Sequence, residues 1–347
     1  MSDPGEDREP SAETPGLVCA HHHLYSTLAR GMPAPPRVPR NFPEILELVW
    51  WRLDRALDLE MIRWSTMLGA LEALERGTTA IVDHHSSPNA IEGSLDVIAE
   101  ACAEVGVRAR CCYEVTDRNG PEGTKAGIAE NERFLKGGGS GFVGAHACFT
   151  LSEETLEAVA GLSAELGCGV HIHVCEDRVD SAAGGRLEGV SSDNWLLAHC
   201  VHLDRPLRGT VAHNPRSNMN NAVGYARPAR WRAPVALGTD GIGADMLEEF
   251  RIAYVRHRED DVTASPDTAW SWLEGGYELV PEAREDRVVW SYEPMDPWHL
   301  AFTPGVRPLE VVVGGEVVLR DGRPTRVDPA EVRGRAREQA ERLFARL

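Results

Sequence analysis

Short apolar runs, each ending in or just before a polar or ionisable residue, recur along the chain from residue 17 to residue 240. They are rich in valine, alanine and isoleucine, and longer segments separate them, which is typical of buried parallel strands that alternate with helices. The runs are Leu17–Ala20, Thr78–Asp83, Val107–Val115, Gly141–His146, Gly169–His173, Trp195–His199, Gly209–His213 and Pro234–Asp240. Eight such strands predict an α/β fold, a (β/α)8 TIM-like barrel with its catalytic groups at the carboxyl ends of the strands.

The segments between these runs contain helical patterns. Residues 59–76 and 91–105 have helical spacing, and Gly106 is placed to end the second of these helices. Thr150, with Glu153 three residues later, has the spacing of a capping box and predicts the start of another helix.

Two connections differ from the regular pattern. Only six residues lie between His202 and Gly209, whereas a crossover between parallel strands needs about a dozen or more. We therefore expect an eroded barrel whose sixth helix is short or missing, unless one of these two strands is misassigned. The connection after the first strand is long, with a proline-rich stretch at Pro33–Pro43 followed by Trp50 and Trp51. Long insertions are usually functional, so we expect either an active-site wall or lid, or a helix packed on the surface.

The pattern changes near residue 285, where short β-like runs replace the alternation of strands and helices. Three of these runs are Arg287–Tyr292, Leu309–Val313 and Glu316–Arg320. A Gly-Gly pair joins the last two, which predicts a hairpin, and a charged helix is expected from about Pro329. The expected organisation is a disordered tail at 1–15, a barrel at 16–285, and a hairpin or partial β-sandwich with a terminal helix at 286–347.

Composition and charge exclude several classes of partner. The chain has 54 acidic and 36 basic residues, a formal net charge of -18, and a surface this negative repels nucleic acid and anionic membranes. No apolar run approaches the ~18 residues of a membrane span, and the polar, acidic N-terminus shows no secretory signal. The eight cysteines contain no Cys-x-x-Cys pair and predict reduced thiols in the cytoplasm.

Histidines gather at the expected strand ends, and 11 of the 13 precede residue 214. In the run of three that follows the first strand, His21 and His23 lie on one side of an extended segment and the middle histidine faces away. His171 and His173 likewise share a face, and Glu176 follows His173 by three residues. Imidazoles at this spacing suit zinc or iron, and a nearby carboxylate can move protons from a water molecule on the metal.

Further ionisable residues end four of the remaining strands: His146, His199, His213 and Asp240. Asp240, in Thr-Asp-Gly, would by itself be read as an ordinary turn residue. Together with the two His-x-His motifs, these residues place ionisable groups at the ends of six strands, an alignment that chance does not explain.

At this point the chain resembles a known family, the metal-dependent amidohydrolase superfamily, and within it the cytosine-deaminase-like aminohydrolases and chlorohydrolases. The SsnA-type aminohydrolases are the most similar. The motifs that carry the resemblance lie within about residues 15–255 and are AHHHLYSTLARGM, VDHHSSP, HVCED, LAHCVHLD, AHNPRSNMNNAVGYA and ALGTDGIGADMLEE.

The resemblance implies one divalent transition metal, zinc or alternatively iron. Its ligands would be His21, His23, His173 and Asp240, and Glu176 would be the proton shuttle. The family has a dinuclear branch that needs a carbamylated lysine at the end of the fourth strand. The chain has only two lysines and neither is there, so a mononuclear site fits better.

The remaining site residues are also carried over from the family. His199 would stabilise the intermediate and Asp240 would act as a base, so that both are catalytic together with the shuttle. His146, Trp50 and Asn218 are expected to contact the substrate, whereas His171 would be a neighbour of the metal ligands and not a ligand.

The resemblance implies a hydrolytic deaminase that attacks an amino-substituted N-heterocycle through a metal-bound hydroxide. Water and a small heterocyclic molecule are then the expected partners, and a homo-oligomer is compatible with the sequence. Two alternatives stay open. One is an amide, C–N or C–Cl hydrolase on the same site. The other is a catalytically impaired metal-binding relative, because family members carry roughly fifty or more residues before the first barrel strand and this chain has about sixteen.

Overall fold

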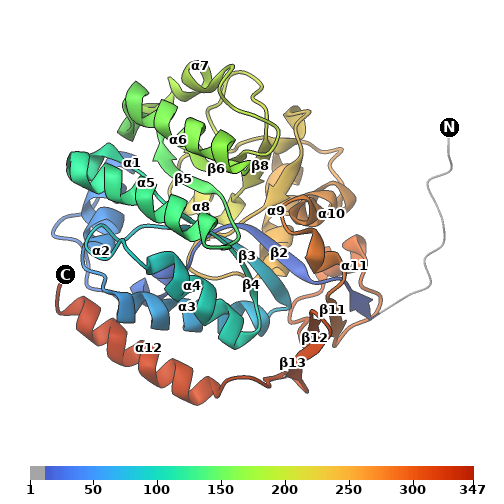
Figure 1. Ribbon diagram of the computed structural model, residues 1–347. Coiled ribbons are helices and arrows are strands. Elements are labelled where there is room, and N and C mark those ends of the chain that lie inside the picture. The colour runs from blue at the N-terminus through green and yellow to red at the C-terminus, as the bar shows by residue number, and fades with distance from the viewer. Residues whose placement is uncertain (1–11) are drawn as a thin grey trace.

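The computed structural model describes residues 12–347, and its centre is a ring of parallel strands surrounded by helices (Figure 1). The strands are β2 (Leu17–His23), β3 (Thr78–His85), β4 (Arg108–Tyr113), β5 (Val143–Ala147), β6 (Val170–Val174), β7 (Leu196–His199), β8 (Thr210–His213), β9 (Val235–Leu237) and β10 (Asp240–Gly241). Their pairing follows the chain order, from β2 to β4 and from β5 to β9. The eight predicted strands are thus present, the last of them as β9 and β10.

Two seams close the ring. Two isolated parallel bridges join β4 to β5: Cys111 of β4 pairs with Gly141, just before β5, and Val115, just after β4, pairs with Ala145 of β5. At the other seam β9 pairs with β8, whereas β10 pairs with β2. Between them, Gly238 N donates to the carbonyl of His213 and Thr239 N donates to the carbonyl of His21, each at 3.0 Å. The last barrel strand therefore changes partner at Gly238, and the barrel prediction is confirmed.

The helices outside the barrel become short on one side. The long ones are α3 (Leu59–Leu74), α4 (Ser94–Val105), α5 (Gly120–Lys136), α6 (Glu153–Leu166), α9 (Met246–Asp260) and α10 (Pro266–Glu274). After β6 and β8 come only α7 (Ala183–Leu187) and α8 (Pro215–Asn220), and the described residues between β7 and β8 contain no helix. The prediction of a missing sixth helix is confirmed.

Local capping explains where these helices begin and end. The Asp58 carboxylate accepts from Met61 N at 2.9 Å and starts α3. Gly106 ends α4 in the left-handed conformation, as predicted. The capping box expected at Thr150 is wrong: Ser152 is the N-cap of α6. The Thr150 hydroxyl is already committed to the preceding 3₁₀ turn, where it donates to the carbonyl of Ala147.

The insertion after β2 folds into one nearly continuous helical segment. It consists of α1 (Phe42–Ile45), a π-helical turn η2 (Leu46–Trp50) and α2 (Trp51–Asp54). The Asn41 side chain caps its start by accepting from Glu44 N. π-turns inside helices frequently mark functional sites, and the residues of this segment line the cavity described below. The interpretation of the insertion as an active-site wall therefore agrees with the structure.

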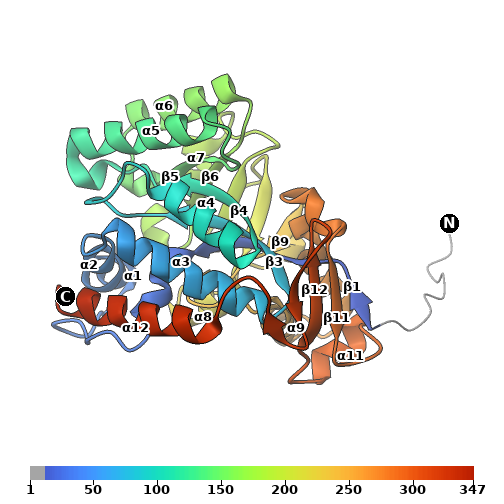
Figure 2. The same cartoon turned by 60° about the horizontal axis from the view of Figure 1, so that its bottom comes forward.

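A small antiparallel sheet and a terminal helix complete the molecule (Figure 2). The sheet runs in the order β1 (Glu13–Thr14), β11 (Arg287–Trp290), β12 (Pro308–Val313), β13 (Glu316–Arg320) and β14 (Arg323–Pro324). It is followed by α12 (Pro329–Phe344), and α11 (Pro297–Phe302) lies in the β11–β12 connection. The predicted hairpin and terminal helix are present. Residues 13–14 pair with β11 and so depart from the expected tail, whose first eleven residues lie outside the described range.

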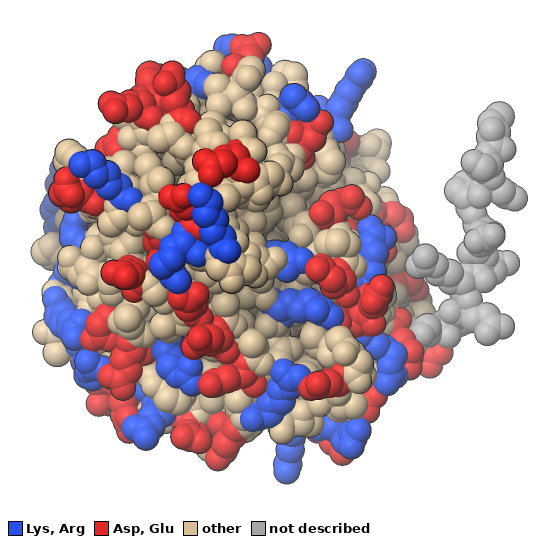
Figure 3. Space-filling view, viewed as in Figure 1, with Lys and Arg blue, Asp and Glu red and all other residues tan. Residues whose placement is uncertain are grey.

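Surface and interior differ sharply in chemistry. Acidic and basic side chains are interspersed over the face in Figure 3, and many of them form ion pairs such as Arg227 with Asp260. All eight cysteines carry free thiols, and seven of them are buried; Cys168 is half-buried. Among residues 12–347, no helix is long and apolar enough to cross a membrane.

Candidate active site

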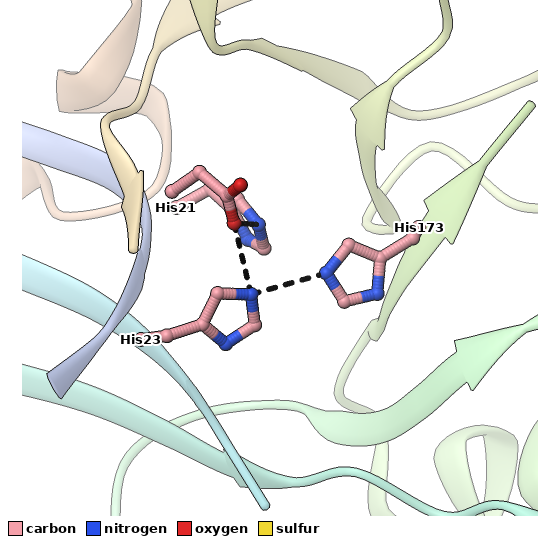
Figure 4. Close-up of side chains that lie close together, drawn as sticks. His21, His23 and His173 are labelled. Carbon is pink, nitrogen blue, oxygen red and sulfur yellow. Dashed lines mark hydrogen bonds and ion pairs between the residues drawn. The ribbon is translucent and has the colours of Figure 1, made fainter. Parts of the chain in front are cut away.

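Four side chains from three strands converge at the carboxyl end of the barrel. His21 and His23 come from β2, His173 from β6 and Asp240 from β10, and their donor atoms all lie within 4.8 Å of one another. Asp240 Oδ1 is 3.3 Å from His21 Nε2 and 3.0 Å from His23 Nε2. The rings of His23 and His173 point toward each other, with their Nε2 atoms 3.2 Å apart (Figure 4).

The protons on these imidazoles can be assigned from their other contacts. His23 Nδ1 lies 2.5 Å from the carbonyl oxygen of His84, and His173 Nδ1 lies 2.7 Å from that of His146. A carbonyl oxygen only accepts, so both Nδ1 atoms carry a proton, and each ring turns its Nε2 toward the other at 3.2 Å. When both rings are neutral, these atoms present two facing lone pairs that repel each other, and a cation between them removes the repulsion. The donor set therefore fits a divalent transition metal.

Asp240 is held as an anion in an unusual backbone conformation. Burial alone would raise the pKa of Asp240, but the hydrogen bonds and charge from His21 and His23 bring it well below its usual range. Burial likewise opposes the charged form of His23, but Asp240 outweighs burial and raises the pKa of His23 to about 9, so a metal ion bound at its Nε2 would take the place of a proton there. The φ of Asp240 is +58°, a left-handed value that non-glycine residues adopt at a cost and that clusters at functional sites.

A second cluster contains Glu176, His199 and Asp240, again with donor atoms within 4.8 Å. Burial raises the pKa of Glu176 to about 7, although His199 acts in the opposite direction. Asn221 Nδ2 donates to Glu176 Oε1 at 3.3 Å. His199 Nδ1 lies 2.7 Å from Asn218 Oδ1 and so carries the proton. Its Nε2 is buried 3.6 Å from Glu176 Oε2 and has no hydrogen-bond partner among the described residues.

A cleft opens onto both clusters. Trp50 and His146 line it, as expected of substrate contacts, and Trp51, Phe42 and Phe149 make its wall largely aromatic. Such a wall suits a flat, partly apolar molecule.

Three other residues from the sequence stand outside the wall of this cleft. Asn218, expected to contact the substrate, is not among the residues that line it and holds His199 through the hydrogen bond above. His171 Nε2 is 2.8 Å from His21 Nδ1, consistent with a neighbour of the ligands. His213 is buried against Trp272, away from both clusters.

Comparison of the sequence with known proteins assigns the chain to a family. A sequence profile described as the Amidohydrolase family matches residues 13–274. The chain belongs to the amidohydrolase family. Similar proteins include the 5'-deoxyadenosine deaminase of Methanopyrus kandleri, 29% identical over 95% of this chain and 86% of that protein. The 5-methylthioadenosine/S-adenosylhomocysteine deaminase of Desulforudis audaxviator is 31% identical, with the same coverage of both chains.

Solved structures show the same fold. A zinc-bound adenosine deaminase from Xanthomonas campestris matches this amidohydrolase with a TM-score of 0.79 at 23% identity, covering 96% of this chain and 86% of that one. Atrazine chlorohydrolase TrzN from Arthrobacter aurescens, complexed with zinc, also has a TM-score of 0.79, at 20% identity, covering 98% of this chain and 91% of that one.

Among the polar residues of the cleft wall that sequence reasoning missed are Asp54, Glu114 and Asn221. Glu114 directly follows β4, so the strand-end criterion would have found it had the third strand been included. Asp54 comes from the helical insertion and Asn221 from the end of α8, where no strand pattern points to a site. His84, at the end of β3, is also part of this environment because its Nδ1 is 3.5 Å from Glu114 Oε2.

Proposed function

We propose that this amidohydrolase is a metal-dependent hydrolytic deaminase that replaces the amino group of an N-heterocycle with an oxygen from water and releases ammonia. The observation that carries the proposal is the pair of imidazole Nε2 atoms that face each other beside Asp240, next to a buried carboxylic acid on the same cleft. The names of the deaminase relatives, about 30% identical over nearly the whole chain, support the same reaction.

The four donors His21, His23, His173 and Asp240 would hold the metal. Zinc suits three imidazoles and one carboxylate, and zinc is present in two of the structures that share the fold. When bound there, the ion supplies Lewis acidity that lowers the pKa of a water molecule toward ~7. The proposal names a single ion because His146 is the ionisable residue of β5, and Lys136 lies before that strand in exposed ion pairs with Glu132 and Glu165.

Proton transfer is the proposed role of Glu176. A pKa of about 7 lets this carboxyl group exist in both forms near neutral pH, which is what a group that both accepts and returns protons requires. Glu176 would take a proton from the attacking water, deliver it to a ring nitrogen and then assist protonation of the departing amine. Asn221, which donates to Oε1, would orient the carboxylate.

His199 is proposed to stabilise, with Nε2 also protonated, the negative charge that develops on the attacking oxygen. Its free Nε2 faces the same space as Glu176 and Asp240, and Asn218 fixes the orientation of the ring. A preoriented polar group in a site shielded from water is worth more than the same group in solution. Trp50 and His146 would flank the heterocycle.

The deciding experiment is ammonia release from a panel of aminopurines, aminopyrimidines, pterins and aminotriazines, with bound metal measured on the same sample. We expect about one zinc per chain, the number for one site with three imidazoles and a carboxylate, and ammonia from at least one class. Chloride release from chlorotriazines without ammonia from any amine would refute the deaminase and favour the chlorohydrolase. Bound zinc with no turnover anywhere would favour an impaired relative.

The cytoplasm is the proposed place of action. Eight free thiols, seven of them buried, are typical of proteins from a reducing compartment.

A further inference from the structure

Two carboxylates that the proposed reaction does not use lie on the wall of the cleft. They are Asp54, from the end of the helical insertion, and Glu114, which follows β4. Both side chains are less than 5% exposed. One guanidinium serves both of them: Arg118 forms a close ion pair with Asp54 Oδ2, and its Nη2 lies 3.6 Å from Glu114 Oε1. The guanidinium carbon lies 5.0 Å from the centre of the Trp51 ring, which fixes its position.

Each carboxylate has acceptor capacity to spare. Ser86 Oγ also donates to Asp54 Oδ2, whereas Asp54 Oδ1 is buried and has no partner among the described residues. Glu114 approaches His84 at 3.5 Å and Arg118 at 3.6 Å, and it accepts no side-chain hydrogen bond from residues 12–347. Unpaired buried acceptors are costly. Acceptors that border a cleft can be satisfied by a donor on the ligand.

Glu114 is close to the chemistry. An oxygen of Glu114 and nitrogens of His84 and His173 lie within 4.8 Å of one another. Burial opposes the charged form, but His146, His84 and Arg118 outweigh it and hold the pKa of Glu114 below its usual range. A fixed negative charge therefore sits beside the place where the ring would bind.

The charge of the lining is one-sided. No lysine or arginine of the described chain borders the cleft. Six carboxylates border it: Asp54, Glu114, Glu176, Asp177, Asp180 and Asp240. Arg118 faces two of them and neutralises at most one. Even with one divalent ion bound, the number of carboxylates exceeds the positive charge. Charges interact strongly in such a poorly solvated space, so an anionic substituent would be repelled.

We propose that Glu114 and Asp54 select the substrate: the cleft takes a heterocycle that presents N–H or O–H donors to this pair and is neutral or cationic, and it rejects carboxylate- or phosphate-bearing analogues. This inference rests on the proposed function for the identity of the site, and it concerns binding and not the chemical step. The proposed charge preference distinguishes the compounds named for the relatives. 5'-Deoxyadenosine carries no charged substituent, whereas S-adenosylhomocysteine carries a carboxylate and an amine.

The test measures binding separately from turnover. Calorimetric titrations use the full-length, zinc-loaded Glu176→Gln variant, in which hydrolysis is expected to be too slow to interfere. The ligands are adenosine, 5'-amino-5'-deoxyadenosine and adenosine 5'-monophosphate, which share the base and differ in charge. We expect the amine to bind at least as tightly as adenosine and the phosphate to bind about tenfold more weakly or worse.

A second substitution identifies the groups responsible. Adding Glu114→Gln keeps the shape of the side chain and removes its charge, so the ratio of adenosine to adenosine 5'-monophosphate affinity should fall toward one. Glu122→Gln, the same change on an exposed position of α5, should leave the ratio as it was.

The outcomes separate this inference from the proposed function. Equal or tighter binding of the phosphate, a ratio that Glu114→Gln leaves unchanged, or no binding of any of the three would overturn the inference, whatever the wild-type enzyme turns over. The predicted charge preference without ammonia release by the wild type would refute the deaminase and leave the binding inference standing.

Discussion

Single protons on buried imidazoles decide what the centre of this amidohydrolase can bind. Backbone carbonyls fix the proton of His23 and of His173 on Nδ1, and the amide oxygen of Asn218 does the same for His199. Each ring therefore turns its Nε2 toward the centre, where His23 and His173 can bind a metal ion and His199 can contact the attacking oxygen. Acceptors behind the rings act as the outer contacts that orient metal ligands in proteins.

At this scale, Glu176→Gln separates proton transfer from metal binding. The amide keeps the size of the side chain and cannot take up a proton, so turnover should fall by ~10²–10⁴ while bound zinc stays near the wild-type amount. His173→Ala should lose both, because it removes a proposed ligand. Metal content and ammonia release measured on the same samples check this. Full activity in Glu176→Gln would refute the assigned role.

A second prediction at the residue scale concerns Asp83, whose carboxylate accepts from Leu24 N at 2.7 Å while Oδ2 has no partner among the described residues. Burial raises the pKa of Asp83 from about 4 in an unfolded chain to about 7. Below about pH 4 this carboxyl group is neutral in both the folded and the unfolded chain, so its burial adds no cost of ionisation. As the pH rises from there through 7, the free energy of unfolding falls by on the order of a few kcal/mol.

The melting temperature of the wild type should therefore fall more between about pH 4 and pH 7, the interval between the two pKa values of this carboxyl group, than that of Asp83→Asn. The amide adds a constant offset, so the slope with pH is the quantity to compare. Asp321→Asn, at an exposed turn with φ of +52° that asparagine also tolerates, should keep the wild-type slope. Parallel slopes for Asp83→Asn and the wild type would contradict the prediction.

The strand-end rule predicted most of the candidate centre from the sequence, because parallel strands of a barrel bring their carboxyl ends together. It placed His21, His23, His173 and Asp240 correctly near one another. It could not place Asp54 or Asn221, since these residues reach the cleft from helices whose docking depends on packing and leaves no periodic signal.

At the scale of elements, the short helix α8 organises the turn that carries Asp240. Arg216, in its first turn, donates through Nη2 to the carbonyls of Thr239 and Ile242, at 2.9 and 2.8 Å, and to that of Gly241 at 3.2 Å. Its Nε donates to the buried Glu249 of α9 at 2.8 Å. These contacts hold the left-handed backbone at Asp240 from one side and explain why a helix of six residues suffices here.

Replacement of Arg216 by lysine should therefore loosen zinc and not only lower stability. Lysine keeps the charge but lacks the fork that reaches the three carbonyls and Glu249 at once, so zinc should pass more readily to a chelator. Arg216→Ala should also destabilise the fold by about 3–5 kcal/mol, because Glu249 stays buried without its partner. Chelator competition followed with a zinc indicator, with Arg208→Lys at an exposed pair with Asp193 as the control, checks this. Unchanged zinc retention in Arg216→Lys would refute it.

Elements were predicted well where pattern and caps agree, as for the ring of strands and for α4. The absence of a helix between β7 and β8 was predicted from the length of that connection alone, since so few residues cannot form a crossover helix. The start of α6 was missed because Thr150 and Ser152 are both good caps, and only the preceding 3₁₀ turn decides between them.

On the scale of the whole molecule, the two ends of the described chain tie the small sheet and the barrel together. β1 pairs with β11 of the small sheet, and α12, which follows that sheet, lies along α3 of the barrel. Val332 and Leu343 of α12 are buried in the same apolar core as residues of α3 and α4, and Arg342 pairs with Glu60 at 2.7 Å. The division at residue 285 is therefore best taken as a change of architecture, and we expect barrel and C-terminal part to unfold together.

Leu343→Ala tests this expectation. Loss of a fully buried leucine should cost about 2–5 kcal/mol, and the loss should appear as a shift of a single urea transition followed by both tryptophan fluorescence and circular dichroism. Val38→Ala, where the side chain is 82% exposed, should shift nothing measurable. A separate early transition confined to α12 would show that the C-terminal part is an independent unit.

Alkylation of the buried cysteines can report which parts of the barrel unfold. Burial raises the pKa of every one of the eight thiols, and alkylating reagents react with the exposed thiolate. Cys111 and Cys112 sit on one strand and Cys175 and Cys200 beside others, so different parts of the barrel carry their own label sites. Iodoacetamide should leave the folded protein almost unmodified. The order in which cysteine-containing peptides become alkylated as the urea concentration rises should then show which strands of the barrel separate first.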